Sequence, residues 1–390
     1  MRHRRLIVLA LIVGALTLLV VQGGAAAHKQ PNHAKKQHVK KDGNDGSALK
    51  HIFVIMLENH SQSSVIDDVN APFITQLAHS NAMAADYFGV THPSEPNYVA
   101  AISGSNWFVQ NDNPANRFDH TNLVDQLEAN GLTWGAYMES MPSAGYLGDF
   151  APVLPTGTVQ LYASKHNPFV LFNDIRSNPA RLAHDKPYTA LATDLQKEST
   201  TPNFVWITPN QCHDMHGGVF VSVAPDGSDG TPCPFGSSKD DAFDAALKHK
   251  ADVFVKGAVM TIEGSQAWKS GHSAIFILTD ENDFTGNSAT DGWESAAGCC
   301  DSPILPAGYQ FQNSAGLPDG NVWAGGQYGG GLIPAIIITN KGGQPAGYVS
   351  HTPYNHYSLL ATIEQEWGLG FLANASDRAQ VTPMTEFLTH

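Results

Sequence analysis

The chain has 390 residues, 42% of them hydrophobic, with 18 Phe and 7 Trp, and this composition excludes a mostly disordered protein. Residues 1–50 contain nine basic and two acidic side chains, so residues 51–390 hold 13 basic against 34 acidic ones, a net charge of −21. A body this acidic gains no attraction from phosphate backbones. A general nucleic-acid binder is therefore excluded, and no nucleic acid is expected among the partners.

Residues 1–27 have the pattern of a secretory signal peptide. Three arginines precede an apolar stretch at 6–21, and three alanines at 25–27 supply the small residues that precede a cleavage site. We predict cleavage after Ala27; the alternative is an uncleaved anchor, for which 16 residues at 6–21 are short. Residues 28–50 are polar and basic and predict a flexible linker. The mature protein is expected to be secreted or held in the cell envelope, without a stable membrane span.

From residue 51 onward, short apolar runs alternate with amphipathic stretches. The apolar runs are rich in β-branched and aromatic residues and predict buried strands at 52–57, 134–138, 204–208, 274–279 and 333–339. The amphipathic stretches predict helices at 72–81, 123–130, 188–197, 240–263 and 356–367. Such an order is typical of an α/β fold with a mainly parallel central sheet and helices on both faces. Because no composition shift divides residues 51–390, we expect a single domain there.

The chain has four cysteines, at positions 212, 233, 299 and 300. Export favours disulfides, and three pairings are open, between which the sequence does not choose. No C-x-x-C spacing exists, which disfavours a metal site built from cysteines. Segments rich in Gly, Asn, Asp and Pro predict long loops at 225–239 and 284–331.

Polar clusters follow three of the predicted strands. They contain Glu58 and Asn59, Asp214 and His216, and Asp280 and Glu281. Each cluster alone is also typical of ordinary turn and cap residues. Because ligands bind outside the carboxyl ends of parallel strands, the three clusters together predict at least four carboxylates at one edge of the sheet. Their mutual repulsion is relieved most simply by a divalent cation.

Ser94 lies between two prolines, just before a helix that is predicted to begin near Pro96. A helix N-terminus favours negative charge, which suits both a nucleophilic hydroxyl and an incoming phosphate. A plain capping role for Ser94 stays open, and Thr91 is the rival nucleophile. His356 precedes the last predicted helix and is either an ordinary helix-start residue or a metal ligand at the same edge.

Taken in order, these segments resemble the phosphoesterase family, which contains acid phosphatases and phospholipases C within the alkaline-phosphatase-like superfamily. The resemblance runs from about residue 51 to 370 and is carried by Glu58-Asn59-His60-Ser61, His92-Pro93-Ser94-Glu95-Pro96-Asn97-Tyr98, residues 125–142, 165–169 and 210–216, Asp280-Glu281 and the segment from His356. It implies an alkaline-phosphatase-like α/β fold. Sulfatase chemistry is set aside, because no Arg stands two residues after Pro96.

The resemblance also implies a metal-dependent site. It implies ligands for one metal at Glu58, Asn59, Ser94, Asp280 and Glu281. It suggests ligands for a second metal at Asp214, His216 and His356. Ser94 would be the nucleophile, and His216 or His356 would activate water. Phosphate oxygens would be bound by Asn97 and His166. We expect one or two divalent ions, from Ca, Mg, Mn, Zn or Fe.

The expected function is that of a phosphomonoesterase, similar to acid phosphatases, that works through a phosphoserine intermediate. The form of the Ser94 motif and the length of the body resemble the acid phosphatase branch. The alternative is a phospholipase C or another phosphodiesterase, so the partner is a small phosphate ester or a phospholipid head group. An alternative of another class is a secreted metal- or carbohydrate-binding protein without catalysis.

Overall fold

The computed structural model describes residues 49–154, 157–219, 233–234, 242–283, 302, 304–312, 318–322 and 325–388. The predicted signal peptide, the linker up to residue 48 and much of the two predicted long loops lie outside these residues, as do Cys299 and Cys300. The predicted division into signal peptide, linker and single domain therefore stays a prediction.

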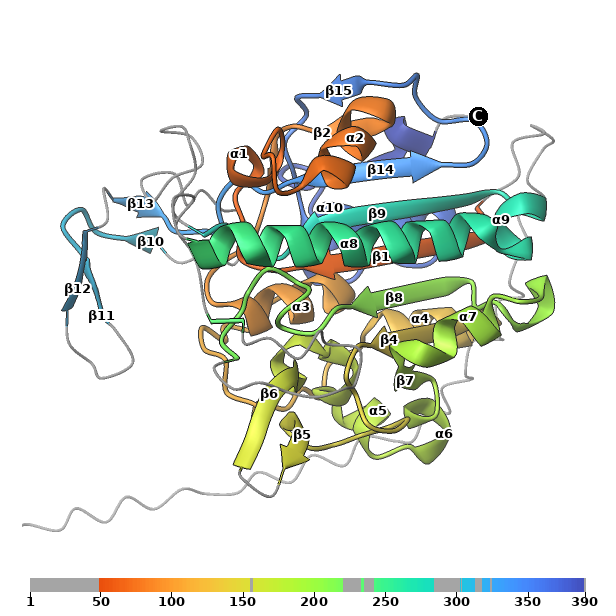
Figure 1. The fold of residues 1–390 in the computed structure, drawn as a ribbon, viewed down its shortest axis with the longest axis horizontal. Coiled ribbons are helices and arrows are strands. Elements are labelled where there is room, and N and C mark those ends of the chain that lie inside the picture. Colours follow the sequence, from red (N-terminus) through yellow and green to blue (C-terminus); the bar gives the residue numbers. More distant parts are fainter. Residues whose placement is uncertain are drawn as a thin grey trace, which may run out of the picture. The chain divides into compact units, whose positions relative to one another are not determined.

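The central sheet contains eight of the described strands, in the order β15-β2-β14-β9-β1-β8-β4-β7 (Figure 1). The strands are β1 (His51–Leu57), β2 (Ala82–Ala84), β4 (Trp134–Met138), β7 (Asp185–Pro187), β8 (Phe204–Thr208), β9 (Ser273–Thr279), β14 (Ala335–Thr339) and β15 (Tyr348–Ser350). β1 is parallel to both β8 and β9, and β4 is parallel to β8 and β7. β14 is antiparallel to β9 and β2. The predicted mainly parallel α/β architecture is confirmed.

Helices cover both faces of this sheet because its central strands are apolar on both sides. One set of β1 side chains enters the core shared with α3 and α10: Ile52, Val54 and Met56. The alternate set enters the core shared with α2 and α8: Phe53, Ile55 and Leu57. Figure 1 shows the long helix α8 running across the sheet over β1 and β9. Burial on both faces explains why the sequence of β1 is a continuous apolar run.

The helices are α1 (Gln62–Val65), α2 (Pro72–Ser80), α3 (Ser94–Ser103), α4 (Leu123–Ala129), α5 (Asn173–Arg176), α6 (Pro179–Leu182), α7 (Leu191–Asp194), α8 (Ala242–Gly264), α9 (Gln266–Ser270) and α10 (His356–Glu366). α3 begins at Ser94, two residues earlier than predicted, because Pro96 is accommodated in a first turn whose N–H groups need no helical partner. The helix predicted at 188–197 is a 3₁₀ turn followed by the short α7. Only Leu191 and Leu195 of this stretch are buried, which gives a longer helix little to pack against. Within the described residues, no helix combines the length and apolar character needed to cross a membrane.

Smaller two-stranded sheets flank the central one. Their strands are β3 (Tyr87–Phe88) with β16 (Tyr354–Asn355), β5 (Phe150–Leu154) with β6 (Gly157–Ala163), β10 (Ile304–Leu305) with β13 (Gly326–Gln327), and β11 (Gln310–Gln312) with β12 (Pro318–Val322). Cys212 and Cys233 form a disulfide. This bond anchors the loop after β8 at Cys212, two positions before Asp214.

Candidate active site

The carboxyl ends of β1, β8 and β9 meet at one edge of the sheet, and backbone hydrogen bonds join the segments that follow them. The backbone N of Glu58 donates to the carbonyl oxygen of Asp214 at 2.7 Å. The backbone N of Asp280 donates to the carbonyl oxygen of Leu57 at 3.0 Å, and Asn59 N donates to Asp280 Oδ1 at 3.0 Å. The three polar clusters of the sequence therefore lie side by side.

Ser94 reaches these acids from the first residue of α3. Its hydroxyl donates to Glu58 Oε2 at 2.8 Å and lies 3.4 Å from Glu281 Oε1. The hydroxyl of Thr91 donates instead to the carbonyl oxygen of His92 at 3.2 Å. Because only Ser94 has a carboxylate as its acceptor, the geometry favours Ser94 over Thr91 as the nucleophile.

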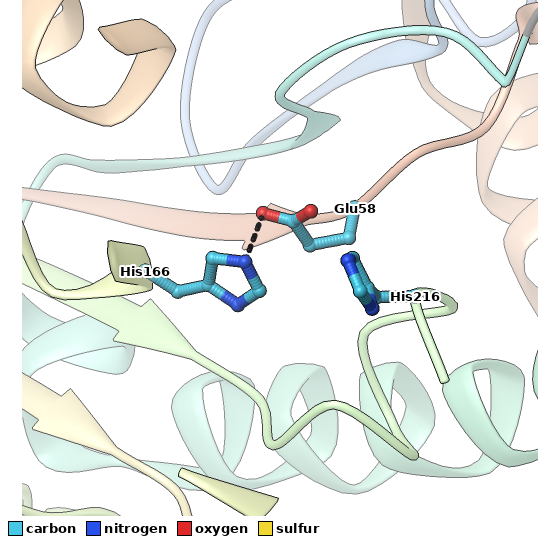
Figure 2. Close-up of side chains that lie close together, drawn as sticks. All are labelled: Glu58, His166 and His216. Atoms are coloured by element: carbon cyan, nitrogen blue, oxygen red, sulfur yellow. Dashed lines mark ion pairs between the residues drawn. The ribbon is translucent and has the colours of Figure 1, made fainter. Parts of the chain in front are cut away.

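Two histidines complete the cluster drawn in Figure 2, where the side chains of Glu58, His166 and His216 converge. His166 Nε2 lies 3.2 Å from Glu58 Oε1, and His166 Nδ1 lies 3.4 Å from Asp214 Oδ2. One ligand atom from each of Glu58, His166 and His216 lies within 4.8 Å of the others, as a metal site requires. His166 was predicted to bind phosphate; its place beside Glu58 makes it a candidate metal ligand as well.

The carboxyl groups of the site disfavour one another's ionisation. Burial, followed by the charges of Asp280 and Asp214, raises the pKa of Glu58 well above its ordinary value. Burial also raises the pKa of Asp214 and of Glu281 well above the ordinary range, and that of Asp280 to about 6. Ionising all four carboxyl groups in one buried site costs much free energy unless a positive charge lies nearby.

The histidines of the site are held in the neutral form that ligates metals. Burial lowers the pKa of His216 to about 3, and it lowers the pKa of His166 well below its ordinary value. His216 Nδ1 donates to the carbonyl oxygen of Gly217 at 2.9 Å, which leaves Nε2 as the basic nitrogen.

Unpartnered acceptor atoms show that the residues present fit a divalent cation. Within the described residues, four buried site atoms lack a hydrogen-bond partner: Glu58 Oε1, Asp214 Oδ2, Asp280 Oδ2 and His166 Nε2. Buried polar groups are rarely left unsatisfied in native proteins. Carboxylate oxygens together with imidazole nitrogen are the donors that Mn, Fe and Zn accept.

Two predicted site residues, His356 and Asn97, form hydrogen bonds with other groups of the protein. His356 Nε2 donates to the carbonyl oxygen of Asp280 at 2.6 Å, so its Nδ1 is the acceptor for the hydroxyl of Tyr87 at 3.3 Å. Both ring nitrogens are thereby engaged, and His356 supports the backbone of Asp280 without joining the cluster of Figure 2. The oxygen of the Asn97 side chain accepts from the backbone N of Val90 and of Thr91. Asn97 therefore holds the segment before Ser94. The roles of His356 as a metal ligand and water activator, and of Asn97 as a phosphate contact, stay predictions.

Three other residues of the site were not assigned a role from the sequence. Lys165 Nζ lies 2.8 Å from Asp112 Oδ2 and 3.3 Å from His216 Nε2. Asp112 Oδ1 also accepts from the backbone N of Glu95, in the first turn of α3. His92 Nδ1 lies 2.7 Å from Glu281 Oε2. The sequence does distinguish Lys165, which is the only Lys or Arg between positions 117 and 176. Asp112 lies in an Asn-rich segment, and no sequence pattern there indicates a site residue.

The profile of the Phosphoesterase family matches this chain over residues 65–227 and 237–370. A probable acid phosphatase from Kluyveromyces lactis is 33% identical over 180 residues, 44% of this chain and 40% of that protein. An acid phosphatase from Aspergillus fumigatus is 34% identical over 44% of this chain and 38% of its own length. A phosphatidylinositol-3-phosphatase from Mycobacterium tuberculosis is 34% identical over 43% of this chain and 52% of its own. The chain thus spans about half or less of each of these relatives.

Solved structures also align with this chain. One is a protein of the alkaline phosphatase superfamily from Vibrio parahaemolyticus, at 9% identity, a TM-score of 0.46, and coverage of 85% of this chain and 70% of that one. Another is the phosphonate monoester hydrolase of Agrobacterium radiobacter, at 12% identity, a TM-score of 0.47, and coverage of 87% and 77%. Similarity this low gives no information about the chemistry of this chain.

Proposed function

Because this chain belongs to the phosphoesterase family, we propose that it is a metal-dependent phosphomonoesterase with Ser94 as its nucleophile. The observation that carries the proposal is the Ser94 hydroxyl, which donates at 2.8 Å to Glu58 at the start of a helix. A hydroxyl that caps a helix stands at the cap position and accepts from a backbone N, whereas the cap position of α3 is Pro93 and the hydroxyl of Ser94 donates to carboxylates. The acid phosphatase relatives favour a monoester as substrate.

The residues that would hold a cation are those with unpartnered acceptor atoms and the cluster of Figure 2: Glu58, His166, Asp214, His216 and Asp280. Asn59 and Glu281 stay predicted ligands. A bound divalent cation supplies positive charge that lowers the pKa of a nearby hydroxyl and offsets the charge of the phosphate. One or two such ions are consistent with this donor set.

Glu58 has the geometry to orient Ser94 and accept its proton. Its Oε2 already accepts the hydroxyl at 2.8 Å, so the ionised carboxylate is placed to take up the proton as Ser94 attacks. Ser94 Oγ bonds to phosphorus while the bond from phosphorus to the leaving oxygen breaks, and the released alcohol takes up a proton. Water then attacks the phosphoserine, releases inorganic phosphate and restores the Ser94 hydroxyl. His216, which burial keeps neutral, would serve this second step as a ligand of the cation that polarises the water.

Lys165 supplies the positive side chain that an incoming phosphate needs in so acidic a site. Burial alone would lower the pKa of Lys165, but the charges of Asp112 and Glu58 raise it, so the amine stays charged. A small phosphate ester is the proposed substrate class. The predicted signal peptide and the disulfide support a location outside the cytoplasm.

The test compares hydrolysis of p-nitrophenyl phosphate and bis-p-nitrophenyl phosphate, before and after chelation and after return of Mn²⁺ or Zn²⁺. We expect preference for the monoester, loss on chelation and recovery with metal. Ser94→Ala is expected to lower kcat by at least about a thousandfold, since the nucleophile is lost. Thr91→Ala is the matched control and should keep kcat within about tenfold.

Intact-mass measurement after acid quenching should find a phosphorylated form of the wild-type protein and none of Ser94→Ala. Preference for the diester would move the protein to the phosphodiesterase and phospholipase C class. Absence of hydrolysis with every metal would favour a binding protein without catalysis.

A further inference from the structure

Tyr98 is buried beside the site, and among the described residues the Glu58 side chain is the one hydrogen-bonding group that acts on its hydroxyl. It lies four residues after Ser94 in α3, so both side chains are on the same side of the helix. A residue needed only to fill the core would be served better by Phe, because an unpaired buried hydroxyl costs free energy. The hydroxyl is therefore expected to form a hydrogen bond within the site.

The ring of Tyr98 lies against the imidazole of His166. The two ring centroids are 5.3 Å apart and the planes are inclined by 12°, which is a stacked arrangement. The Tyr98 ring also packs near Trp206 of β8, at 6.1 Å between centroids. Tyr98 is thus fixed by the sheet and in turn restricts the rotation of His166, whose Nε2 faces Glu58 Oε1.

The hydroxyl of Tyr98 faces the carboxylates of the site. The charged groups that act on it are Glu58, Asp280 and Asp214, with Glu58 first among them. The side chain of Glu58 is also within hydrogen-bonding reach of that hydroxyl, and Glu58 Oε1 has no other hydrogen-bond partner among the described residues. A buried donor and a buried acceptor that lack other partners are expected to form a full hydrogen bond once the site is assembled.

We propose that Tyr98 is a positioning residue: its hydroxyl donates to the Glu58 carboxylate, and its ring holds His166 in line with the same carboxylate. This inference rests on the proposed function for its effect on turnover, but its effect on metal retention does not depend on turnover. Tyr98 acts through Glu58 and His166, which are the groups placed to hold a cation. It sets the orientation of two ligands with one side chain.

Tyr98→Phe tests the hydroxyl, because it keeps the ring and removes only one oxygen. Removal of a group that orients a metal ligand typically weakens metal affinity or activity by about 10- to 100-fold. We expect Tyr98→Phe to weaken Zn²⁺ binding by about tenfold in competition with a chromogenic chelator, and to lower kcat for p-nitrophenyl phosphate with KM little changed. Zn²⁺ affinity and kcat equal to those of the wild type would overturn the role of the hydroxyl.

Tyr137→Phe is the matched control. Tyr137 is also buried, but its hydroxyl donates to Asp194 Oδ2 at 2.7 Å, on the face of the sheet opposite α3. Its loss should lower thermal stability more than Tyr98→Phe does, because a satisfied hydrogen bond to a charge is removed. Zn²⁺ affinity and kcat should be unaffected. A loss in Tyr98→Phe that Tyr137→Phe reproduces would identify a general packing defect and overturn the proposal.

Tyr98→Leu tests the ring. It removes the stacked surface as well, so it is expected to lower Zn²⁺ affinity about tenfold beyond Tyr98→Phe. It should also shift the imidazole proton resonances of His166 in the NMR spectrum of the metal-free protein. Equal affinity and an unshifted His166 in the two variants would overturn the stacking role. If the wild type hydrolyses no phosphate ester, the proposed function fails, and Zn²⁺ affinity and the His166 resonances still decide the role of Tyr98.

Discussion

Glu364 is a buried carboxyl group in α10, and its Oε1 accepts from the backbone N of Leu372 at 2.8 Å. This hydrogen bond and one with the side chain of Gln126 act to lower the pKa of the carboxyl group, but burial outweighs both. Burial raises the pKa of Glu364 from 4.5 to about 8. The folded state therefore holds this proton more tightly than the unfolded state, so the stability that it contributes is present at acidic pH. That contribution is lost as the pH rises from about 4.5 through about 8.

We expect Glu364→Gln to remove this pH dependence. Gln keeps an oxygen for Leu372 N and never becomes charged. Because one pKa unit corresponds to about 1.4 kcal/mol, the stability of the variant relative to wild type should rise by a few kcal/mol between pH 5 and pH 9. Urea unfolding at the two pH values measures this. Glu366→Gln, in the same helix, is the control, and a stability difference independent of pH would contradict the expectation.

At the scale of elements, the loop after β8 is anchored by the disulfide between Cys212 and Cys233, which are 21 residues apart in sequence. The loop carries Asp214 and His216, so its conformation fixes two groups of the site. A disulfide that closes a loop of this length contributes about 3 kcal/mol, chiefly by restricting the unfolded chain.

The double variant Cys212→Ser, Cys233→Ser is expected to lose about 3 kcal/mol of stability and to retain metal more weakly. Thermal unfolding and Zn²⁺ competition measure the two effects. Wild-type protein treated with dithiothreitol should approach the variant, and the variant itself should respond little to the reductant. An unchanged melting temperature would show that the loop is held by its other contacts alone.

For the molecule as a whole, the buried acids are expected to make the free energy of unfolding depend on bound positive charge. Glu58, Asp214, Asp280 and Glu281 share one interior region, and their pKa values are raised by burial. A cation that binds only the folded state stabilises it by RT ln(1 + [L]/Kd), about 2.7 kcal/mol at a hundredfold excess over Kd.

Chelation is therefore expected to lower the melting temperature, and Mn²⁺ or Zn²⁺ should restore it. Glu58→Gln should reduce the metal-induced shift, because an anionic ligand is lost. Asp67→Asn is the control, since Asp67 pairs with His79 in an exposed position. Scanning calorimetry of the chelated and metal-loaded proteins provides the measurement, and identical melting curves would contradict a metal site.

The sequence predicted the long central strands because their apolar runs are continuous, as in β1 and β9. β2, β7 and β15 have three residues each, too few to display a period, and were not predicted. The antiparallel direction of β14 was not predicted either, because strand direction is set by the connections and not by the local apolar pattern.

Within the candidate site, local patterns in the sequence indicated residues that directly follow a strand, such as Glu58 and Asp280, and also Ser94 at the start of a helix. Lys165 and Asp112 enter the site through tertiary contacts between segments distant in the sequence, and no local sequence pattern predicts such contacts. For His356 the sequence indicated the right neighbourhood. It could not reveal that the backbone of Asp280 and the hydroxyl of Tyr87 engage both ring nitrogens.

The loops of the site are joined through main-chain atoms, from Glu58 N to Asp214 O and from Asp280 N to Leu57 O. Every residue type except proline offers the same N–H, and every residue type offers the same carbonyl. Substitution at positions 58, 214 or 280 by any residue other than proline therefore changes the chemistry at this edge and preserves these two main-chain hydrogen bonds, whereas the bond from Asn59 N is lost when Asp280 Oδ1 is removed. Such a frame is evolvable, because new ligand sets can be sampled by single replacements, and it offers protein engineers three adjacent positions for altering metal preference.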